Sequence, residues 1–228
     1  MIPLRDTNPR YTFPIVNYTL ITVNVLVFLF QISLGKNFES FIYTFGLVPY
    51  RLTEQIQFFD LGLRTFLPVF SSMFMHGGWM HLIGNMLFLH IFGDNVEDRI
   101  GHIKYLAFYL LSGIGAAMSQ YFINPYSEIP MVGASGAIAG VLGAYIVMFP
   151  RAKVLTLVPI FYFIQFVELP AYIFLGIWFF MQMLSGVMML GIASDAGGVA
   201  WWAHIGGFVT GLLLLSIFRK RKIYRSYY

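Results

Sequence analysis

Six long apolar stretches follow one another along this 228-residue chain and constrain its fold more than any other feature. An α-helix needs about 20 predominantly apolar residues to cross the hydrocarbon core of a membrane. Because 11% of the residues are charged, against about 25% in a soluble domain, the chain has little polar surface to present to water. We therefore predict an all-α membrane protein, a single bundle of six transmembrane helices. The predicted spans are 15–34, 76–95, 103–123, 133–149, 169–190 and 199–218.

The distribution of Lys and Arg gives this bundle a direction. Cytoplasmic loops of membrane proteins carry an excess of these residues. With six spans and a cytoplasmic N-terminus, the outer loops hold only Lys36, Arg51 and Arg64 of the 14 basic residues. A seventh span would place the basic cluster at 219–225 outside, so six spans and two cytoplasmic termini are the better prediction. The inner side then holds Arg5, Arg10, Arg99, Lys104, Arg151, Lys153, Arg219, Lys220, Arg221, Lys222 and Arg225.

Two segments between the predicted spans carry both polar and aromatic residues. Residues 35–65 are predicted to lie in the outer membrane interface, where side chains of both kinds are favourable. Residues 154–167 are predicted to lie in the inner interface, because Pro159 and Gln165 interrupt them. The fifth span then begins near Pro170, since proline is tolerated in a first helical turn.

Several chemistries are excluded by what the sequence lacks. There is no cysteine, which rules out disulfides, thiolate metal sites and a cysteine nucleophile. The residues that follow His76 and His81 are Gly77 and Leu82, so no His-Glu-x-x-His zinc motif is present. No pair of aspartates falls inside the spans, and no nucleic-acid-binding motif occurs. We predict no metal and no cofactor.

Polar residues inside membrane spans are costly, and three groups of them stand out here. His81 and Asn85 are four residues apart, so they share one helix face and could donate hydrogen bonds to a single oxyanion. Ser135 lies between glycines at the outer end of the fourth span, near free backbone N–H groups. His204 lies a few residues inside the sixth span. Taken singly, each group could instead serve interhelical packing, and a membrane histidine could also relay protons.

Together these residues supply the nucleophile, the base and the oxyanion donors that acyl transfer needs, all near the outer ends of their spans. No carboxylate is placed to orient His204. Asp195 lies in the preceding loop, and Asp94 and Glu97 lie at the opposite membrane face. The sequence therefore predicts a Ser–His dyad. Small residues at Gly136–Gly140 and Gly207–Gly211 also predict close contact between the fourth and sixth spans.

At these residues the chain resembles the rhomboid family of intramembrane serine proteases. The match consists of Gly-x-Ser-Gly at Gly133–Gly136, His-x-x-x-Asn at His81–Asn85 and Ala-His-x-x-Gly at Ala203–Gly207. Glu97-x-Arg99 also resembles a family feature with a structural role. The motifs occur in the family's order, and the resemblance covers the chain 1–228 as one rhomboid-like transmembrane domain.

The resemblance implies that Ser135 is the nucleophile and His204 the general base. It also implies an oxyanion hole formed by His81, Asn85 and the Ser135 N–H. Gly133, Gly136 and Gly207 support the site. Transmembrane proteins would be the substrates, and the fifth span, with Trp178 and Gln182, would act as their gate.

One departure from the family's pattern concerns the support of His204. Members often carry an aromatic residue four positions after the serine, stacked on the histidine, whereas this chain has Ala139. Trp201 or Trp202 could take its place, or the ring is held less firmly. A non-catalytic relative that binds membrane proteins and a proton-coupled transporter are the alternative functions. Because the chain is short and lacks a targeting presequence, we expect a prokaryotic plasma membrane.

Overall fold

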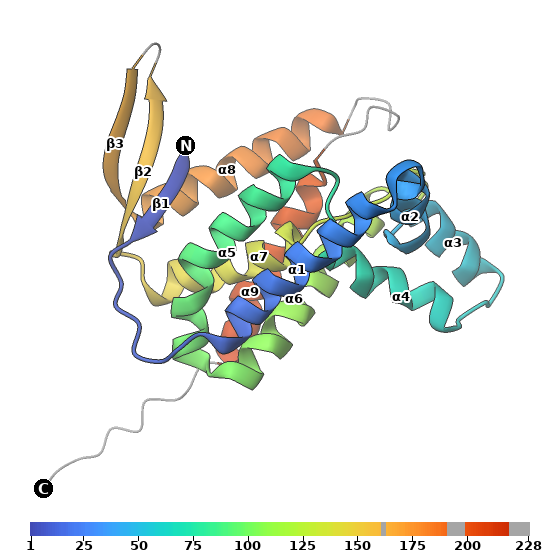
Figure 1. The fold of residues 1–228 in the computed structure, drawn as a ribbon, viewed down its shortest axis with the longest axis horizontal. Helices are drawn as coiled ribbons and strands as arrows, with labels where there is room; N and C mark the ends of the chain where they lie inside the picture. The colour runs from blue at the N-terminus through green and yellow to red at the C-terminus, as the bar shows by residue number, and fades with distance from the viewer. Residues whose placement is uncertain (161–162, 191–198, 219–228) are drawn as a thin grey trace, which may run out of the picture.

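The computed structural model describes residues 1–160, 163–190 and 199–218, most of which are helical (Figure 1). Each of the six predicted apolar stretches forms one long helix. The basic cluster at 219–225 and Asp195 lie outside the described residues. The long helices are α1 (Ile15–Ser33), α5 (Trp79–Ile100), α6 (His102–Ile123), α7 (Ser135–Met148), α8 (Ala171–Met189) and α9 (Trp201–Phe218).

Four of these helices, α1, α6, α8 and α9, are long and apolar enough to cross a membrane. They make the chain an integral membrane protein. Helix α7 is apolar but has 14 residues, and the last two turns of α5 contain Asp94, Glu97, Asp98 and Arg99. Four of the predicted spans therefore correspond to candidate membrane-spanning helices, and the count of six crossings stays a prediction.

A three-stranded antiparallel sheet corrects the prediction that the fold is all-α. Its strands are β1 (Ile2–Asp6), β2 (Lys153–Ile160) and β3 (Phe163–Pro170), in the order β1-β2-β3. Alternate β2 side chains, those of Val154 and Thr156, are fully buried, while the hairpin projects away from the helices (Figure 1). The β-branched and aromatic residues of 154–167, which we assigned to the inner interface, instead form paired strands.

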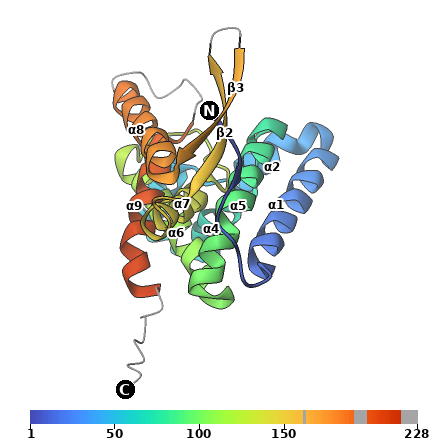
Figure 2. The same cartoon turned by 90° about the vertical axis from the view of Figure 1, so that its left-hand side faces the viewer.

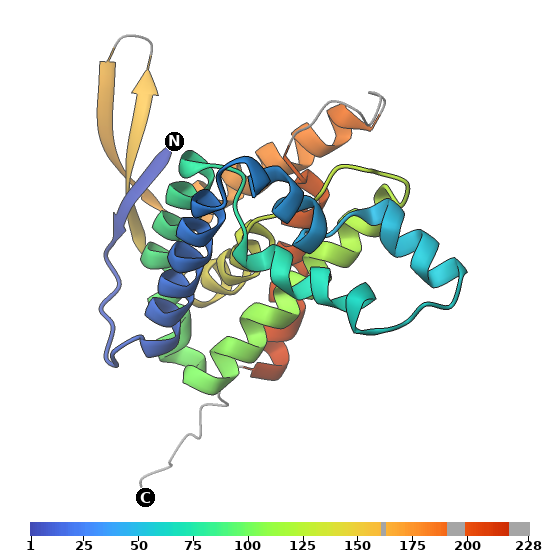
Figure 3. The ribbon, with the colours of Figure 1, turned by 45° about the vertical axis from the view of Figure 1, so that its right-hand side comes forward.

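Short helices fill the segment between α1 and α5. They are η1 (Gly35–Asn37), α2 (Phe38–Phe45), α3 (Pro49–Gln57), α4 (Leu63–Ser71) and η2 (Ser72–Phe74). Figure 3 shows them grouped on one side of the bundle, at the end remote from the sheet. Their predicted place in the outer interface stays a prediction.

Helix α7 is the centre of the bundle. Its residues from Gly136 to Tyr145 are all buried, and α5, α6, α8 and α9 surround it (Figure 2). On one side α9 packs against it through glycines, since a Cβ added at Gly207 or Gly211 would lie under 3.0 Å from a carbonyl oxygen of α7. The predicted contact between the Gly136–Gly140 and Gly207–Gly211 segments is confirmed.

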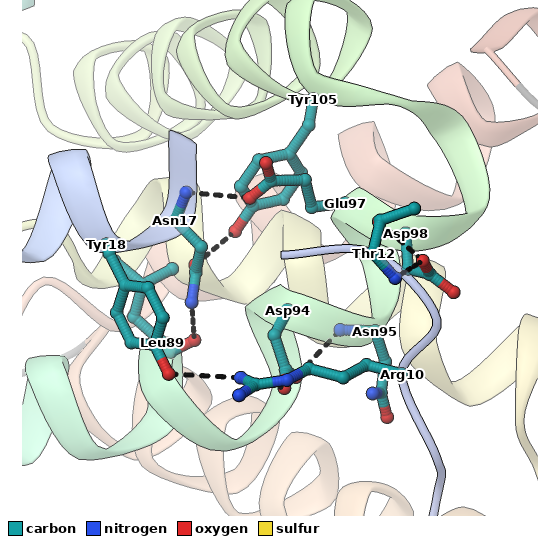
Figure 4. A network of polar contacts seen from close by, with 10 residues as sticks. All are labelled: Arg10, Thr12, Asn17, Tyr18, Leu89, Asp94, Asn95, Glu97, Asp98 and Tyr105. Carbon is teal, nitrogen blue, oxygen red and sulfur yellow. Dashed lines mark hydrogen bonds and ion pairs between the residues drawn. The ribbon is translucent and has the colours of Figure 1, made fainter. Parts of the chain in front are cut away.

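A polar network ties the start of α1 to the end of α5 (Figure 4). The Glu97 carboxylate is fully buried and accepts hydrogen bonds from the backbone N–H groups of Val16 (3.0 Å) and Asn17 (2.7 Å). A negative charge at a helix N-terminus satisfies free donors and complements the helix dipole. Nearby, Asp98 accepts two hydrogen bonds from Thr12. Glu97 therefore has the structural role that the resemblance implied.

Candidate active site

Ser135 and His204 lie in contact although 69 residues separate them in the chain. Ser135 is the first residue of α7, and His204 lies one turn into α9. The Ser135 hydroxyl and His204 Nε2 are 2.8 Å apart and share a hydrogen bond. The structure thus brings together the two residues that we predicted as nucleophile and base.

The glycines beside this pair allow the backbones to approach. A Cβ at Gly207 would lie under 3.0 Å from the Gly136 carbonyl oxygen, and one at Gly136 would lie 2.5 Å from the Ala116 Cβ of α6. Small residues permit close helix contact in membrane proteins. Backbone packing therefore sets the separation of Ser135 and His204.

His81 lies on the other side of Ser135, next to Gly133. Its Nδ1 accepts a hydrogen bond from the Gly77 N–H at 3.4 Å, so its proton is on Nε2. A Cβ at Gly133 would lie 2.6 Å from that Nε2 and 3.6 Å from Ser135 Oγ. Because Gly133 has no side chain and a φ of 128°, the space between the imidazole N–H and the hydroxyl stays open.

Asn85 is one turn after His81 on α5, as the sequence predicted. It is 8% exposed, and its side-chain nitrogen has no hydrogen-bond partner among the described residues. A buried amide donor without a partner is costly and is often kept for a ligand or a reacting group.

A cavity adjoins Ser135 on the side of α6. Its walls consist mainly of glycine, alanine and methionine, with Ser72 at one side. These side chains offer little charge and little bulk. The cavity suits a small, apolar group placed next to the hydroxyl. Among its lining residues are Met73, Ala116, Gly133, Gly136 and Ala203.

Two contacts of His204 were not predicted, and both come from α8. The Gln182 side-chain oxygen lies 2.7 Å from His204 Nδ1. The Trp178 ring lies 6.0 Å from the imidazole at 34° between planes, and Trp201 meets it edge-on at 6.3 Å. Of the two aromatic residues that we proposed as replacements at Ala139, Trp201 does contact the ring. The resemblance had named Trp178 and Gln182 as part of a substrate gate, and not as contacts of His204.

Fold and site together define a helical membrane protein with a partly buried Ser–His pair, in which Ser135 lies on α7, His204 on α9, and α8 contacts the histidine. A model of the Rhomboid domain matches residues 64–221. This chain belongs to the rhomboid family.

Curated relatives agree with this assignment. The chain is 32% identical to Rhomboid protease GluP of Bacillus subtilis over 132 residues, 58% of this chain and 24% of that protein. It is 32% identical to Rhomboid protease AarA of Providencia stuartii over 145 residues, 57% and 49% of the two chains. With Rhomboid protein 1, mitochondrial, of Saccharomyces cerevisiae the identity is 28% over 151 residues, 64% and 40% of the two chains. The chain spans less than half the length of these three relatives. Because one of them is mitochondrial, our expectation of a prokaryotic membrane is unsupported.

Proposed function

We propose that this protein is an intramembrane serine endopeptidase that hydrolyses peptide bonds in or near the transmembrane segments of other membrane proteins. The observation that carries this proposal is the 2.8 Å hydrogen bond between Ser135 and His204. The named proteases among the relatives support it. The substrate must expose its backbone at the site, because a stable helix hides its carbonyl groups in its own hydrogen bonds.

The reaction begins at the Ser135 hydroxyl. As Oγ attacks the peptide carbonyl, His204 Nε2 takes its proton, and the carbonyl oxygen becomes negatively charged. The negative charge is held by the Ser135 N–H at the start of α7, the His81 Nε2–H and the Asn85 amide. Each such donor is worth about 10²–10³-fold in rate when it is aimed at the developing oxyanion.

Two further steps complete the reaction and regenerate the free Ser135 hydroxyl. His204 gives the proton to the leaving amine, which departs and leaves an acyl-serine ester. A water molecule, activated by His204, then hydrolyses the ester and releases the second product. The cavity beside Ser135, walled by small residues such as Ala116 and Gly136, would hold a small side chain next to the cleaved bond.

The proposal is tested with detergent-purified protein and a fluorescent transmembrane peptide. Ser135→Ala and His204→Ala should each lower cleavage at least about 10³-fold, and a chelator should change nothing. Ser216→Ala on α9 and His90→Ala on α5 are matched controls, since both side chains are exposed and neither belongs to the motifs. Equal cleavage by wild type and Ser135→Ala would reject Ser135 as the nucleophile. Substrate capture without cleavage would favour the binding alternative.

A further inference from the structure

Both ring nitrogens of His204 lie within hydrogen-bond distance of another side chain, Nε2 of Ser135 and Nδ1 of Gln182. Its Nδ1 lies 2.7 Å from the side-chain oxygen of Gln182, which is 7% exposed and belongs to α8. Inside a membrane bundle, a buried amide that makes such a contact has been taken out of water at a cost. The contact therefore calls for a function beyond packing.

Under the proposed function, the two contacts of His204 fix where the protons of these groups lie. The Ser135 hydroxyl has one proton, and it must point to His204 Nε2 for the serine to be activated. A neutral imidazole that accepts at Nε2 carries its own proton at Nδ1. That proton is donated to Gln182 Oε1. The glutamine thus selects the one tautomer of His204 that can act as a base toward Ser135.

Helix α8 also fixes the plane of the imidazole ring. Trp178 precedes Gln182 by four residues, so both lie on the same face of α8. The Trp178 ring lies beside the imidazole, tilted by 34° with the ring centres 6.0 Å apart, and Trp201 of α9 meets the imidazole edge-on. One helix therefore sets the tautomer and also supports the ring, in a protein with Ala139 where an aromatic residue would otherwise stack.

We propose that Gln182 is a positioning residue, which holds His204 in the tautomer and orientation that the reaction with Ser135 requires. This inference rests on the proposed function. An amide can do in a membrane what a carboxylate does in soluble serine proteases, without placing a negative charge in a low-dielectric environment. The arrangement is a neutral triad of Ser135, His204 and Gln182.

The inference predicts a change in turnover and in pH dependence, which a merely structural role would not produce. Gln182→Met keeps the size and removes the acceptor. We expect it to lower kcat about 10- to 100-fold while KM stays within about twofold. Gln182→Glu keeps a hydrogen-bond acceptor at this position. Its carboxylate adds a negative charge, which favours the protonated imidazole. We expect it to recover activity at alkaline pH and to move the acid limb of the pH–rate profile upward by about one unit or more.

The matched control is Gln120→Met on α6, a partly buried glutamine whose side-chain oxygen has no partner among the described residues. It should leave kcat, KM and the pH profile unchanged. A thermal unfolding curve for each variant shows whether it folds. If Gln182→Met does not fold, Gln182→Glu decides the question: an unshifted acid limb overturns the inference.

A fluorophosphonate probe separates this inference from the proposed function. If Ser135 is labelled and required for cleavage, but Gln182→Met has wild-type kcat and pH profile, the inference alone is wrong. If wild type neither cleaves the peptide nor takes up the probe, the proposed function fails and the inference falls with it. If labelling at Ser135 slows with kcat in Gln182→Met and shifts with pH in Gln182→Glu, both are supported.

Discussion

The two sides of α9 hold His204 in different ways. Toward α7 the contact is between backbones: a Cβ at Gly207 would clash with the Gly136 carbonyl, and one at Gly211 with the Gly140 carbonyl. Toward α8 the contact is between side chains. There Phe179 stacks on Phe208 at 4.5 Å. A Cβ at Gly186 would meet its neighbours at 3.4 Å or more, an ordinary contact distance.

This difference separates two tasks. The α7 side fixes where Ser135 and His204 are, and it has no room for adjustment. The α8 side fixes how the imidazole is turned, through the side chains of Trp178 and Gln182. Helix α8 is also largely exposed on its far face, at Phe180, Leu184 and Met188 among others. Under the proposed function, a displacement of α8 would release the orientation of His204 without separating the two reacting atoms.

The largest effect on stability and cleavage is expected from a substitution at the contact between α7 and α9. Gly207→Ala places a methyl group against the backbone of Gly136, so the helices must move apart. We expect the free energy of unfolding to fall by about 1–3 kcal/mol, as in other overpacked sites. Cleavage should fall about 100-fold, because a shift of about 1 Å between reacting groups costs that much. Thermal unfolding and peptide cleavage measure the two effects.

The control for this change is Gly176→Ala in α8. A Cβ there meets nothing within 4 Å, and alanine favours a helix by about 0.5–1 kcal/mol over glycine. Its stability should therefore rise slightly and its activity stay constant. If Gly207→Ala instead behaves like Gly176→Ala, the contact between α7 and α9 has room for an added methyl group, and the described difference between the two sides of α9 is wrong.

A smaller effect on the cleavage rate is expected from Trp178→Leu, at the contact between α8 and His204. Aromatic pairs contribute about 0.5–1.5 kcal/mol beyond their buried area, which converts to at most about tenfold in rate. The loss should appear in kcat, with the acid limb unmoved because Gln182 still accepts from Nδ1. Trp79→Leu on α5 is the matched control, since Trp79 packs on Phe28. A 100-fold loss for Trp178→Leu would mean that the two sides do not differ as described.

The smallest effect on activity is expected at Asp6, far from both sides of α9. Burial raises the pKa of Asp6 from 3.8 to about 6, in β1, where it accepts a hydrogen bond from the Tyr145 hydroxyl. Between these two values the folded protein holds the proton that the unfolded chain releases, so stability falls as the pH rises through this window. Asp6→Asn should remove this dependence and leave cleavage unchanged. Unfolding temperatures from about pH 4 to about pH 7 measure it; an unchanged slope in the variant would exclude Asp6 as its source.

The helices were predictable because their apolar composition is continuous along the chain. The shared face of His81 and Asn85 follows from local spacing alone, and the fourth span was predicted to start at 133, two residues before α7 begins. The sheet was missed because proline and polar residues at 154–167 were weighed as interruptions of a helix. The β-branched and aromatic residues of β2 and β3 were the better signal.

The orientation of His204 could not be predicted in the same way. Which residue of α8 meets Nδ1 depends on the rotation of α8 about its own axis, and no local pattern in the sequence specifies it. The resemblance named Gln182 as part of the gate, and its polarity inside an apolar span marked it as well, but neither signal linked it to His204. The sequence shows that position 139 holds alanine and no aromatic residue. Only the packed structure shows that Trp178 lies beside His204 in its place.

Whether His204 activates Ser135 is tested most directly by covalent labelling of the purified protein with a fluorophosphonate probe. Intact-mass measurement and peptide mapping then locate the adduct. An activated serine reacts with such a probe through the same attack that begins peptide cleavage. We expect a single adduct on Ser135, absent in Ser135→Ala and slowed at least about 10³-fold in His204→Ala. An adduct of equal yield in Ser135→Ala, or unchanged labelling of Ser135 in His204→Ala, would contradict this expectation.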